Sequence, residues 1–320
     1  MKALITGITG FVGSHMAEHL LKKKVEVYGT YRWRSRTENI EDFKDKLMLV
    51  DCELLDPTAV KECIKEVEPD VIYHLAAQSY VLSSFKQPAV TIQVNVLGTL
   101  NILESVRQLK LNPIIHICSS SEVYGQVRKD EIPIVETNPL RPASPYGVSK
   151  VGEDMLGLQY YLSYGLRTIR TRMFTHTGPR RGPVFAESSF AKQIAEIEKG
   201  KRDPVIQVGN LKSVRTFADV RDTVRAYCLL TEKCPAGEVY NIGGNRTVTV
   251  GEMLDYLISQ ARPNVRKIIK IKVEPSRLRP SDVTLQIPSI EKFRKATGWE
   301  PEIPFEQTMK DLLNYWRSKV

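Results

Sequence analysis

Short apolar runs alternate with longer amphipathic stretches along the first half of the chain. The apolar runs predict strands over residues 2–6, 25–30, 47–51, 71–75 and 114–118. The stretches between and after them predict helices over residues 14–23, 57–66, 90–109 and 146–163. Because the strands are apolar throughout and helices separate them, the pattern predicts a parallel sheet covered on both faces. This is the doubly wound α/β class of Rossmann type.

The alternation loosens after about residue 175. Strand-like pieces recur at 205–208 and 239–242, and prolines interrupt the last part of the chain at 275, 280, 288, 301 and 304. We therefore expect a first domain over residues 1–175 and a smaller lobe over residues 176–320. Some segments of the lobe are expected to return to the sheet.

The composition is that of an ordinary globular protein, with 42% hydrophobic and 26% charged residues among 320. No apolar run approaches the roughly 18 residues that span a bilayer, and a signal-peptide pattern is not evident. A cytoplasmic protein without a membrane partner is expected.

The five cysteines form no CxxC pair, and His15 and His19 lack a third ligand, so neither a disulfide framework nor a metal site is expected.

The net charge of +9 is unevenly distributed. Residues 170–225 hold twelve Lys and Arg against six Asp and Glu, which favours a local anionic ligand or a solvated basic face. A basic stripe interleaved with aromatic residues, typical of single-strand binding, is not evident. We therefore expect no nucleic-acid partner.

The stretch GITGFVGSH begins at Gly7, directly after the first predicted strand. In a strand-turn-helix unit, the first glycine permits a tight turn and the second lets the main chain approach a pyrophosphate. The third lets the helix pack on the strand, and the helix N-terminus faces the phosphates. The stretch therefore predicts a dinucleotide site formed by Gly7, Thr9, Gly10, Phe11, Val12 and Gly13.

The end of the second predicted strand indicates which cofactor is bound. A site that prefers NAD has a carboxylate there for the ribose 2′-hydroxyl, whereas this chain reads Gly-Thr-Tyr-Arg-Trp-Arg-Ser over residues 29–35. A guanidinium group can donate two parallel hydrogen bonds to the oxygens of one phosphate, and a serine hydroxyl can donate a third. Arg32, Arg34 and Ser35 therefore favour the 2′-phosphate of NADP. The alternative is that these side chains only cover a solvated loop.

Candidate catalytic groups follow the fifth predicted strand, at the edge where open α/β sheets bind ligands. Ser120 and Glu122 stand there, and Tyr146 and Lys150 share a face of the next helix because they are four residues apart. A lysine ammonium and an oxidised nicotinamide both favour the tyrosinate, so the phenol can act as a base near neutral pH.

Five further motifs carry a resemblance that extends over essentially the whole chain. They are HLAAQS from His74, SSSEVYG from Ser119, RPASPYGVSK from Arg141, GPRRG from Gly178 and LRPSDV from Leu278. Together they resemble the extended short-chain dehydrogenase/reductase family, and within it the GDP-mannose 4,6-dehydratases and the GDP-4-keto-6-deoxymannose reductases. The arginine loop at 32–36 is similar to the dehydratases. The stretch SFAKQIAEIEKGKRDPVIQVGN is closer to the reductases.

The dehydratase resemblance implies a closed redox cycle. Tyr146 removes the O4 proton of the sugar while a hydride passes from C4 to NADP, Ser120 binds O4, and Lys150 steadies the phenolate. Glu122 then removes the C5 proton, water leaves from C6, and the hydride returns to C6. The reductase resemblance implies instead that NADPH is consumed on the 4-keto sugar, and the reductases also carry a glutamate at the position of Glu122, so this residue does not decide between the two reactions. A binding module without catalysis is a further alternative.

The same resemblance implies additional contacts and an assembly. Cofactor contacts are expected from Glu53, Leu54, Leu75, Ala76, Ala77 and His176, together with Tyr146 and Lys150. Contacts to the GDP-sugar are expected from Ser79, Ser121, Thr175, Arg180, Lys192, Arg215 and Arg279. The family places threonine where this chain has Ser120 and asparagine where it has Thr175. A homodimer through the helices at 90–109 and 146–163 is implied, and the arginine loop could extend it to a homotetramer.

Overall fold

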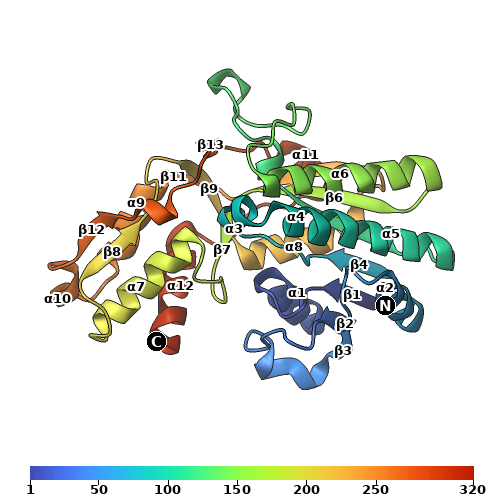
Figure 1. Cartoon of the computed structure of the whole chain (residues 1–320), viewed down its shortest axis with the longest axis horizontal. Coiled ribbons are helices and arrows are strands. Elements are labelled where there is room, and N and C mark those ends of the chain that lie inside the picture. The colour runs from blue at the N-terminus through green and yellow to red at the C-terminus, as the bar shows by residue number, and fades with distance from the viewer.

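The computed structural model describes all residues from 1 to 320, and its centre is a sheet of seven parallel strands (Figure 1). The strand order is β10-β6-β5-β4-β1-β2-β3. These strands are β1 (Lys2–Thr6), β2 (Glu26–Tyr31), β3 (Met48–Asp51), β4 (Val71–His74), β5 (Ile114–Ser120), β6 (Thr168–Met173) and β10 (Val239–Ile242). The order reverses between β1 and β4, which is where doubly wound sheets bind ligands.

Helices cover both faces of this sheet. One face carries α1 (Phe11–Lys22), α8 (Val220–Lys233) and α11 (Glu291–Thr297). The other carries α2 (Pro57–Val67), α3 (Val81–Lys86), α4 (Pro88–Ile92), a π-turn (Gln93–Leu97), α5 (Gly98–Leu109) and α6 (Pro145–Tyr164). Side chains of β1 alternate between the two cores, with Ile5 in one and Leu4 in the other. The predicted Rossmann-type α/β class is therefore confirmed.

A smaller lobe lies at one end of the main sheet, on the left in Figure 1. Its strands are β7 (His176–Thr177), β8 (Val205–Val208), β9 (Val214–Asp219), β11 (Arg246–Thr249), β12 (Lys270–Val273) and β13 (Leu285–Gln286). Its helices are α7 (Ala186–Glu198), α9 (Val250–Ser259), α10 (Pro263–Arg266) and α12 (Phe305–Lys319). They enclose a separate core of 18 buried residues. Because β10 is a strand of the main sheet and α8 covers one of its faces, the second half of the chain contributes to both parts.

One sequence expectation needs correction. The run Pro88–Gln108 is long and apolar enough, by length and composition, to cross a membrane, although no such run was expected. It is partly buried, and its helices pack on α2 and α6. Core helices of globular proteins commonly have these properties.

Candidate active site

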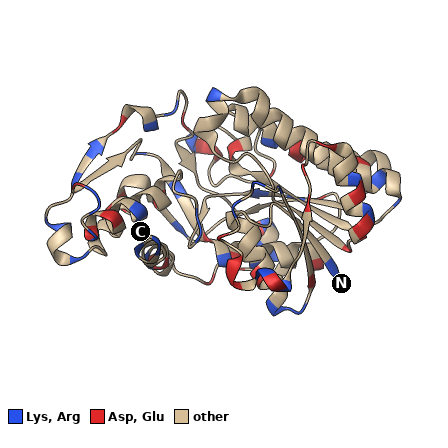
Figure 2. Cartoon of the chain, turned by 60° about the horizontal axis from the view of Figure 1, so that its bottom comes forward, with Lys and Arg blue, Asp and Glu red and all other residues tan.

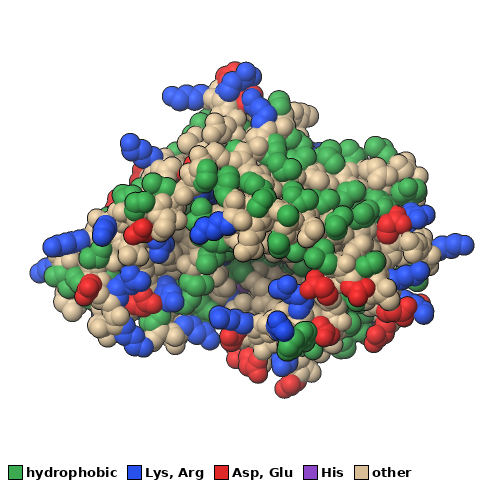
Figure 3. All heavy atoms as spheres, in the orientation of Figure 1, with side chains coloured by type: hydrophobic (Ala, Val, Ile, Leu, Met, Phe, Trp, Pro, Cys, Tyr) green, Lys and Arg blue, Asp and Glu red, His purple; other side chains and the backbone are tan.

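A cleft of about 680 Å³ lies between the main sheet and the smaller lobe. Figure 3 shows this side of the molecule hollowed at the junction of the two parts. The carboxyl ends of β1, β4 and β5 border the cleft from one side, and α7, β9 and the segment 277–286 border it from the other. Residues from both halves of the chain therefore meet at one site.

The glycine turn forms the floor of the cleft beside β1. Gly7 has φ +69°, and a Cβ at this position would lie 2.9 Å from the main chain of Ala76. A Cβ at Gly13 would collide with the Gly7 carbonyl. Helix α1 begins at Phe11 with no side-chain cap, so its first N–H groups are available to a phosphate. All six residues predicted here border the cleft, namely Gly7, Thr9, Gly10, Phe11, Val12 and Gly13.

The loop after β2 borders the cleft with two of its three predicted phosphate ligands. Arg32 and Ser35 line it, and the Ser35 hydroxyl accepts a hydrogen bond from the Arg32 main-chain N–H at 3.1 Å. Arg32 Nη1 lies 3.9 Å from Glu53 Oε2. The third predicted ligand, Arg34, does not line the cleft: its exposed guanidinium stacks on Trp33, 4.4 Å from the ring centre.

The middle of the cleft has an apolar wall. Leu54, Leu75, Ala76 and Ala77 line it, as expected for the flat rings of a dinucleotide. His176 also lines it and stacks on Phe11, with 5.8 Å between ring centres. Burial lowers the pKa of His176 to about 3, so its imidazole is neutral.

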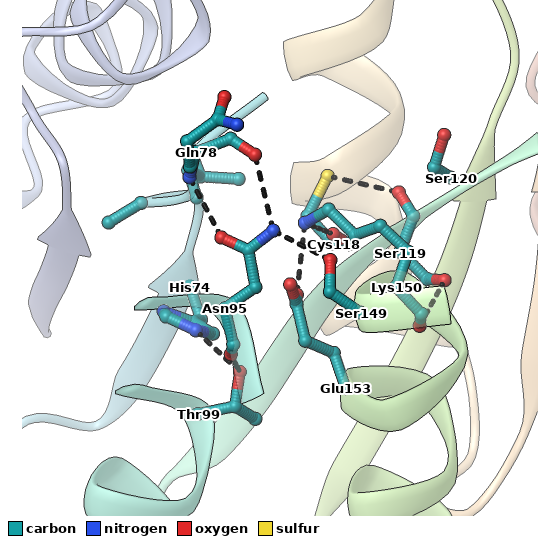
Figure 4. Close-up of polar contacts among 12 residues, drawn as sticks. His74, Gln78, Asn95, Thr99, Cys118, Ser119, Ser120, Ser149, Lys150 and Glu153 are labelled. Carbon is teal, nitrogen blue, oxygen red and sulfur yellow. Dashed lines mark hydrogen bonds and ion pairs between the residues drawn. The ribbon is translucent and has the colours of Figure 1, made fainter. Parts of the chain in front are cut away.

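The four predicted catalytic residues all border the cleft. Tyr146 lies in the first turn of α6, which begins where the Ser144 hydroxyl accepts a hydrogen bond from Gly147 N–H at 3.0 Å. Lys150 follows one turn later, with Nζ 5.8 Å from the centre of the Tyr146 ring. Its ammonium donates to the Cys118 carbonyl and to Glu153, both at 2.9 Å (Figure 4).

Burial and charge act in opposite directions on Tyr146. Burial raises the pKa of its phenol, whereas the ammonium of Lys150 and a hydrogen bond with Ser120 lower it. Burial has the largest single effect on Lys150 and disfavours its ammonium, but the charges of Glu153, Tyr146 and Cys118 and the hydrogen bond to Glu153 together outweigh burial, so the pKa of Lys150 is raised. Lys150 therefore stays protonated and favours the phenolate of Tyr146.

Glu122 is a further carboxylate that borders the cleft. Its main-chain N–H donates to Ser120 Oγ at 3.2 Å, so the two residues are fixed to one another. Gln286 Nε2 donates to Glu122 Oε1 at 3.4 Å, and Arg279 Nη1 lies 3.6 Å from the same oxygen. These contacts hold the carboxylate within the cleft, where it can accept or donate a proton.

The far end of the cleft is basic. Arg215 and Arg279 line it, both within 4 Å of Asp282, and Ser79, Ser121 and Thr175 border the cleft as predicted. Arg180 and Lys192 were also predicted here, but the structure does not place them on the cleft. Arg180 binds Glu18 at 2.9 Å, and Lys192 points toward Trp316 and Glu196.

Sequence reasoning missed several residues that line this end, including Arg181, Phe185, Glu187, Asn210, Arg277 and Gln286. Arg181 lies 3.5 Å above the Phe185 ring and 3.2 Å from Glu187. Arg180 and Arg181 are adjacent in the GPRRG motif, and the spacing of the motif does not indicate which of the two side chains faces the cleft. Arg277 is two residues before the predicted Arg279.

The sheet, the glycine turn and the Ser120-Tyr146-Lys150 arrangement together define an enzyme of the extended short-chain dehydrogenase/reductase class. The model of the GDP-mannose 4,6 dehydratase family matches residues 4–312. The chain therefore belongs to the GDP-mannose 4,6-dehydratase family.

Two relatives and one solved structure illustrate the likeness. A GDP-6-deoxy-D-mannose reductase of Pseudomonas aeruginosa is 32% identical, over 100% of this chain and 98% of its own length. A GDP-mannose 4,6-dehydratase of Yersinia enterocolitica is also 32% identical, over 98% and 92%. The structure of RMD from Pseudomonas aeruginosa complexed with NADPH has a TM-score of 0.83 and 31% identity, covering 100% of this chain and 99% of that one. The similarity thus includes both activities, and it supports a nicotinamide cofactor.

Proposed function

We propose that this protein is a GDP-mannose 4,6-dehydratase that uses NADP. The observation that carries the proposal is the position of Glu122, held in the same cleft as Tyr146 and fixed to Ser120. Oxidation or reduction at a sugar hydroxyl requires only the Ser-Tyr-Lys groups. The loss of water across C5 and C6 requires a further acid and base, and Glu122 is suited to that work.

The residues of the cleft divide the reaction between them. Bound NADP would supply hydride exchange with the sugar, at C4 first and at C6 last. Ser120 holds the O4 hydroxyl, and Tyr146 takes its proton as the C4 carbonyl forms. The ammonium of Lys150 stabilises the phenolate of Tyr146 throughout the reaction. Glu122 takes the C5 proton, which the C4 carbonyl has made acidic, and passes it to the C6 hydroxyl, which leaves as water. When C6 receives the hydride, C5 regains a proton, and the proton that Tyr146 took from O4 balances it.

The second candidate is the reductase, which would consume NADPH on the GDP-4-keto sugar. It is favoured by the almost complete mutual coverage between this chain and the Pseudomonas aeruginosa reductase. In that reaction Tyr146 would donate its proton to O4. Glu122 would then take no part in elimination, and because the family resemblance gives the reductases a glutamate at this position as well, the products of the two reactions are what distinguish them.

Purified protein loaded with NADP and given GDP-mannose tests the proposal. The product should be lighter by one water when it is analysed by mass spectrometry. Tyr146→Phe should lower the rate by about 10²–10⁴-fold, the usual loss of a positioned base. Glu122→Gln should keep oxidation at C4 and lose elimination. If Glu122→Gln turned over GDP-mannose at an unchanged rate, Glu122 would not be the acid and base of the elimination, and the proposal would lose its main support.

A further inference from the structure

Glu153 is a buried carboxylate directly behind the catalytic pair. It lies one turn after Lys150 on α6, and its Oε2 accepts a hydrogen bond from Lys150 Nζ at 2.9 Å (Figure 4). The side chains of Lys150 and Glu153 are 6% and 1% exposed. Lys150 borders the cleft, whereas Glu153 does not. The carboxylate therefore holds the ammonium from the side away from the cleft.

A purely structural role explains this pair poorly. Oε1 of Glu153 is buried without a hydrogen-bond partner. Desolvating a carboxylate whose bonding is incomplete is costly, and apolar side chains of similar volume often fill such a space with greater stability. The pair is therefore better explained by the charge that Lys150 must carry next to Tyr146.

The other titratable groups around Lys150 do not supply this negative charge. His74 on β4 and His116 on β5 are neutral, because burial lowers the pKa of each to about 3. The Cys118 thiol is neutral because burial raises its pKa, and so is the phenol of Tyr227 on α8. Asp154, also on α6, is bound to Arg170 and Arg172. Glu153 is thus the carboxylate that contacts the ammonium.

The charge of Glu153 also reaches Tyr146. Burial raises the pKa of the Tyr146 phenol, Lys150 opposes this change, and Glu153 adds to it. Burial raises the pKa of Glu153 to about 7 despite the attraction of Lys150. Above neutral pH the carboxylate is therefore charged and partly cancels the effect of Lys150 on the phenol.

We propose that Glu153 is a positioning residue: it fixes the ammonium of Lys150 beside Tyr146 and, by compensating part of its charge, sets the pH at which Tyr146 exchanges its proton. This inference rests on the proposed acid-base role of Tyr146. Tyr146 has that role in both the dehydratase and the reductase hypothesis, so the inference does not depend on which of the two reactions occurs.

The test is an ultraviolet titration of tyrosinate in NADP-loaded protein, with the matching Tyr146→Phe chain subtracted in each case. Glu153→Gln should move the Tyr146 midpoint to lower pH by about one unit, since it removes a negative charge near the phenol. Glu153→Asp keeps the charge and should restore the midpoint. Glu198→Gln is the matched control, because the Glu198 side chain is also 1% exposed and pairs with Arg317, and neither residue borders the cleft. It should move nothing.

The titration needs no turnover, so the Tyr146 midpoint can be measured even if the proposed substrate is wrong. The pH profile of kcat/KM on the active substrate should move by the same amount as the titration. An unchanged or higher midpoint in Glu153→Gln would overturn the proposal, and so would an equal shift in Glu198→Gln. If Glu153→Gln does not fold, Glu153→Met removes the same charge at similar volume and is expected to lower the midpoint as well.

Discussion

Single side chains account for the cofactor preference that we propose. Arg32 lines the cleft at the end of β2, whereas Arg34, two residues later, is exposed and stacked on Trp33. The two arginines have the same chemistry and nearly the same place in the sequence. Only Arg32 lines the cleft, so the two arginines form a natural pair of test and control for binding of a 2′-phosphate.

Arg32→Ala should weaken NADP binding by about 1–3 kcal/mol, the range for a charge-assisted hydrogen bond, which corresponds to about 5- to 150-fold in affinity. NAD has no 2′-phosphate, so its affinity should stay within about twofold. Calorimetric titration with both cofactors measures the difference. Arg34→Ala should leave both affinities unchanged, and an equal loss of NADP affinity in both variants would contradict the assignment.

At the scale of elements, α6 carries the candidate catalytic side chains Tyr146 and Lys150, and buried ion pairs connect this helix to the sheet. Asp154 on α6 binds Arg170 at 2.9 Å and Arg172 at 2.8 Å, both on β6, and all three side chains are at most 5% exposed. This ion-paired cluster fixes the helix against the strand next to β5. It therefore supports the position of Tyr146 and Lys150.

Asp154→Asn should lower the free energy of unfolding by about 3–5 kcal/mol, because it leaves two buried guanidinium groups without their charged partner. Urea unfolding followed by circular dichroism measures this loss. The exposed pair Glu18–Lys22 provides the comparison, since Lys22→Met should change stability by less than about 0.5 kcal/mol. Equal effects of the two variants would show that the cluster is not important for stability.

The same cluster explains where prediction from the sequence fails. The apolar strands were predicted to within a few residues, and β1, β8 and β10 match their predicted limits. Strand β6 was missed because Arg170 and Arg172 make it look solvated, although it is buried throughout. The partner that neutralises them, Asp154, lies on another element, and a local pattern does not reveal such a pairing.

In the candidate site, too, prediction failed where a long side chain pairs with a residue outside the cleft. Residues in fixed turns and on helix faces, such as Gly7, Tyr146 and Lys150, reached the cleft as predicted. Arg180 and Lys192 did not, because long side chains in the lobe point toward the nearest carboxylate. Many arginines of the basic segment are neutralised in this way, and acidic side chains lie among the basic ones over both parts of the chain (Figure 2).

At the scale of the whole molecule, one surface suits self-association. Leu97, Val148 and Leu162 are exposed on the π-turn and α6, with Leu162 71% exposed. Figure 3 shows hydrophobic side chains gathered over the region of α5 and α6. Apolar patches of this kind commonly mark contacts between subunits.

We therefore expect a dimer of twice 36.3 kDa through this surface. Light scattering at micromolar concentration measures the mass, and Leu162→Glu should shift it toward the monomer. Ile271→Glu, at a site 46% exposed on β12 in the other lobe, should leave the dimer intact. A monomeric wild-type protein would contradict the expectation.

The transfer of deuterium within one molecule tests the central claim most directly. GDP-mannose carrying deuterium at C4 is incubated with NADP-loaded protein, and the product is analysed by mass spectrometry and NMR. A dehydratase returns the hydride that it removes, so the label should appear at C6 of a product lighter by one water, with no net change in NADPH absorbance. If the protein leaves GDP-mannose untouched and oxidises NADPH stoichiometrically against the 4-keto sugar, the dehydratase assignment is wrong and the protein is the reductase.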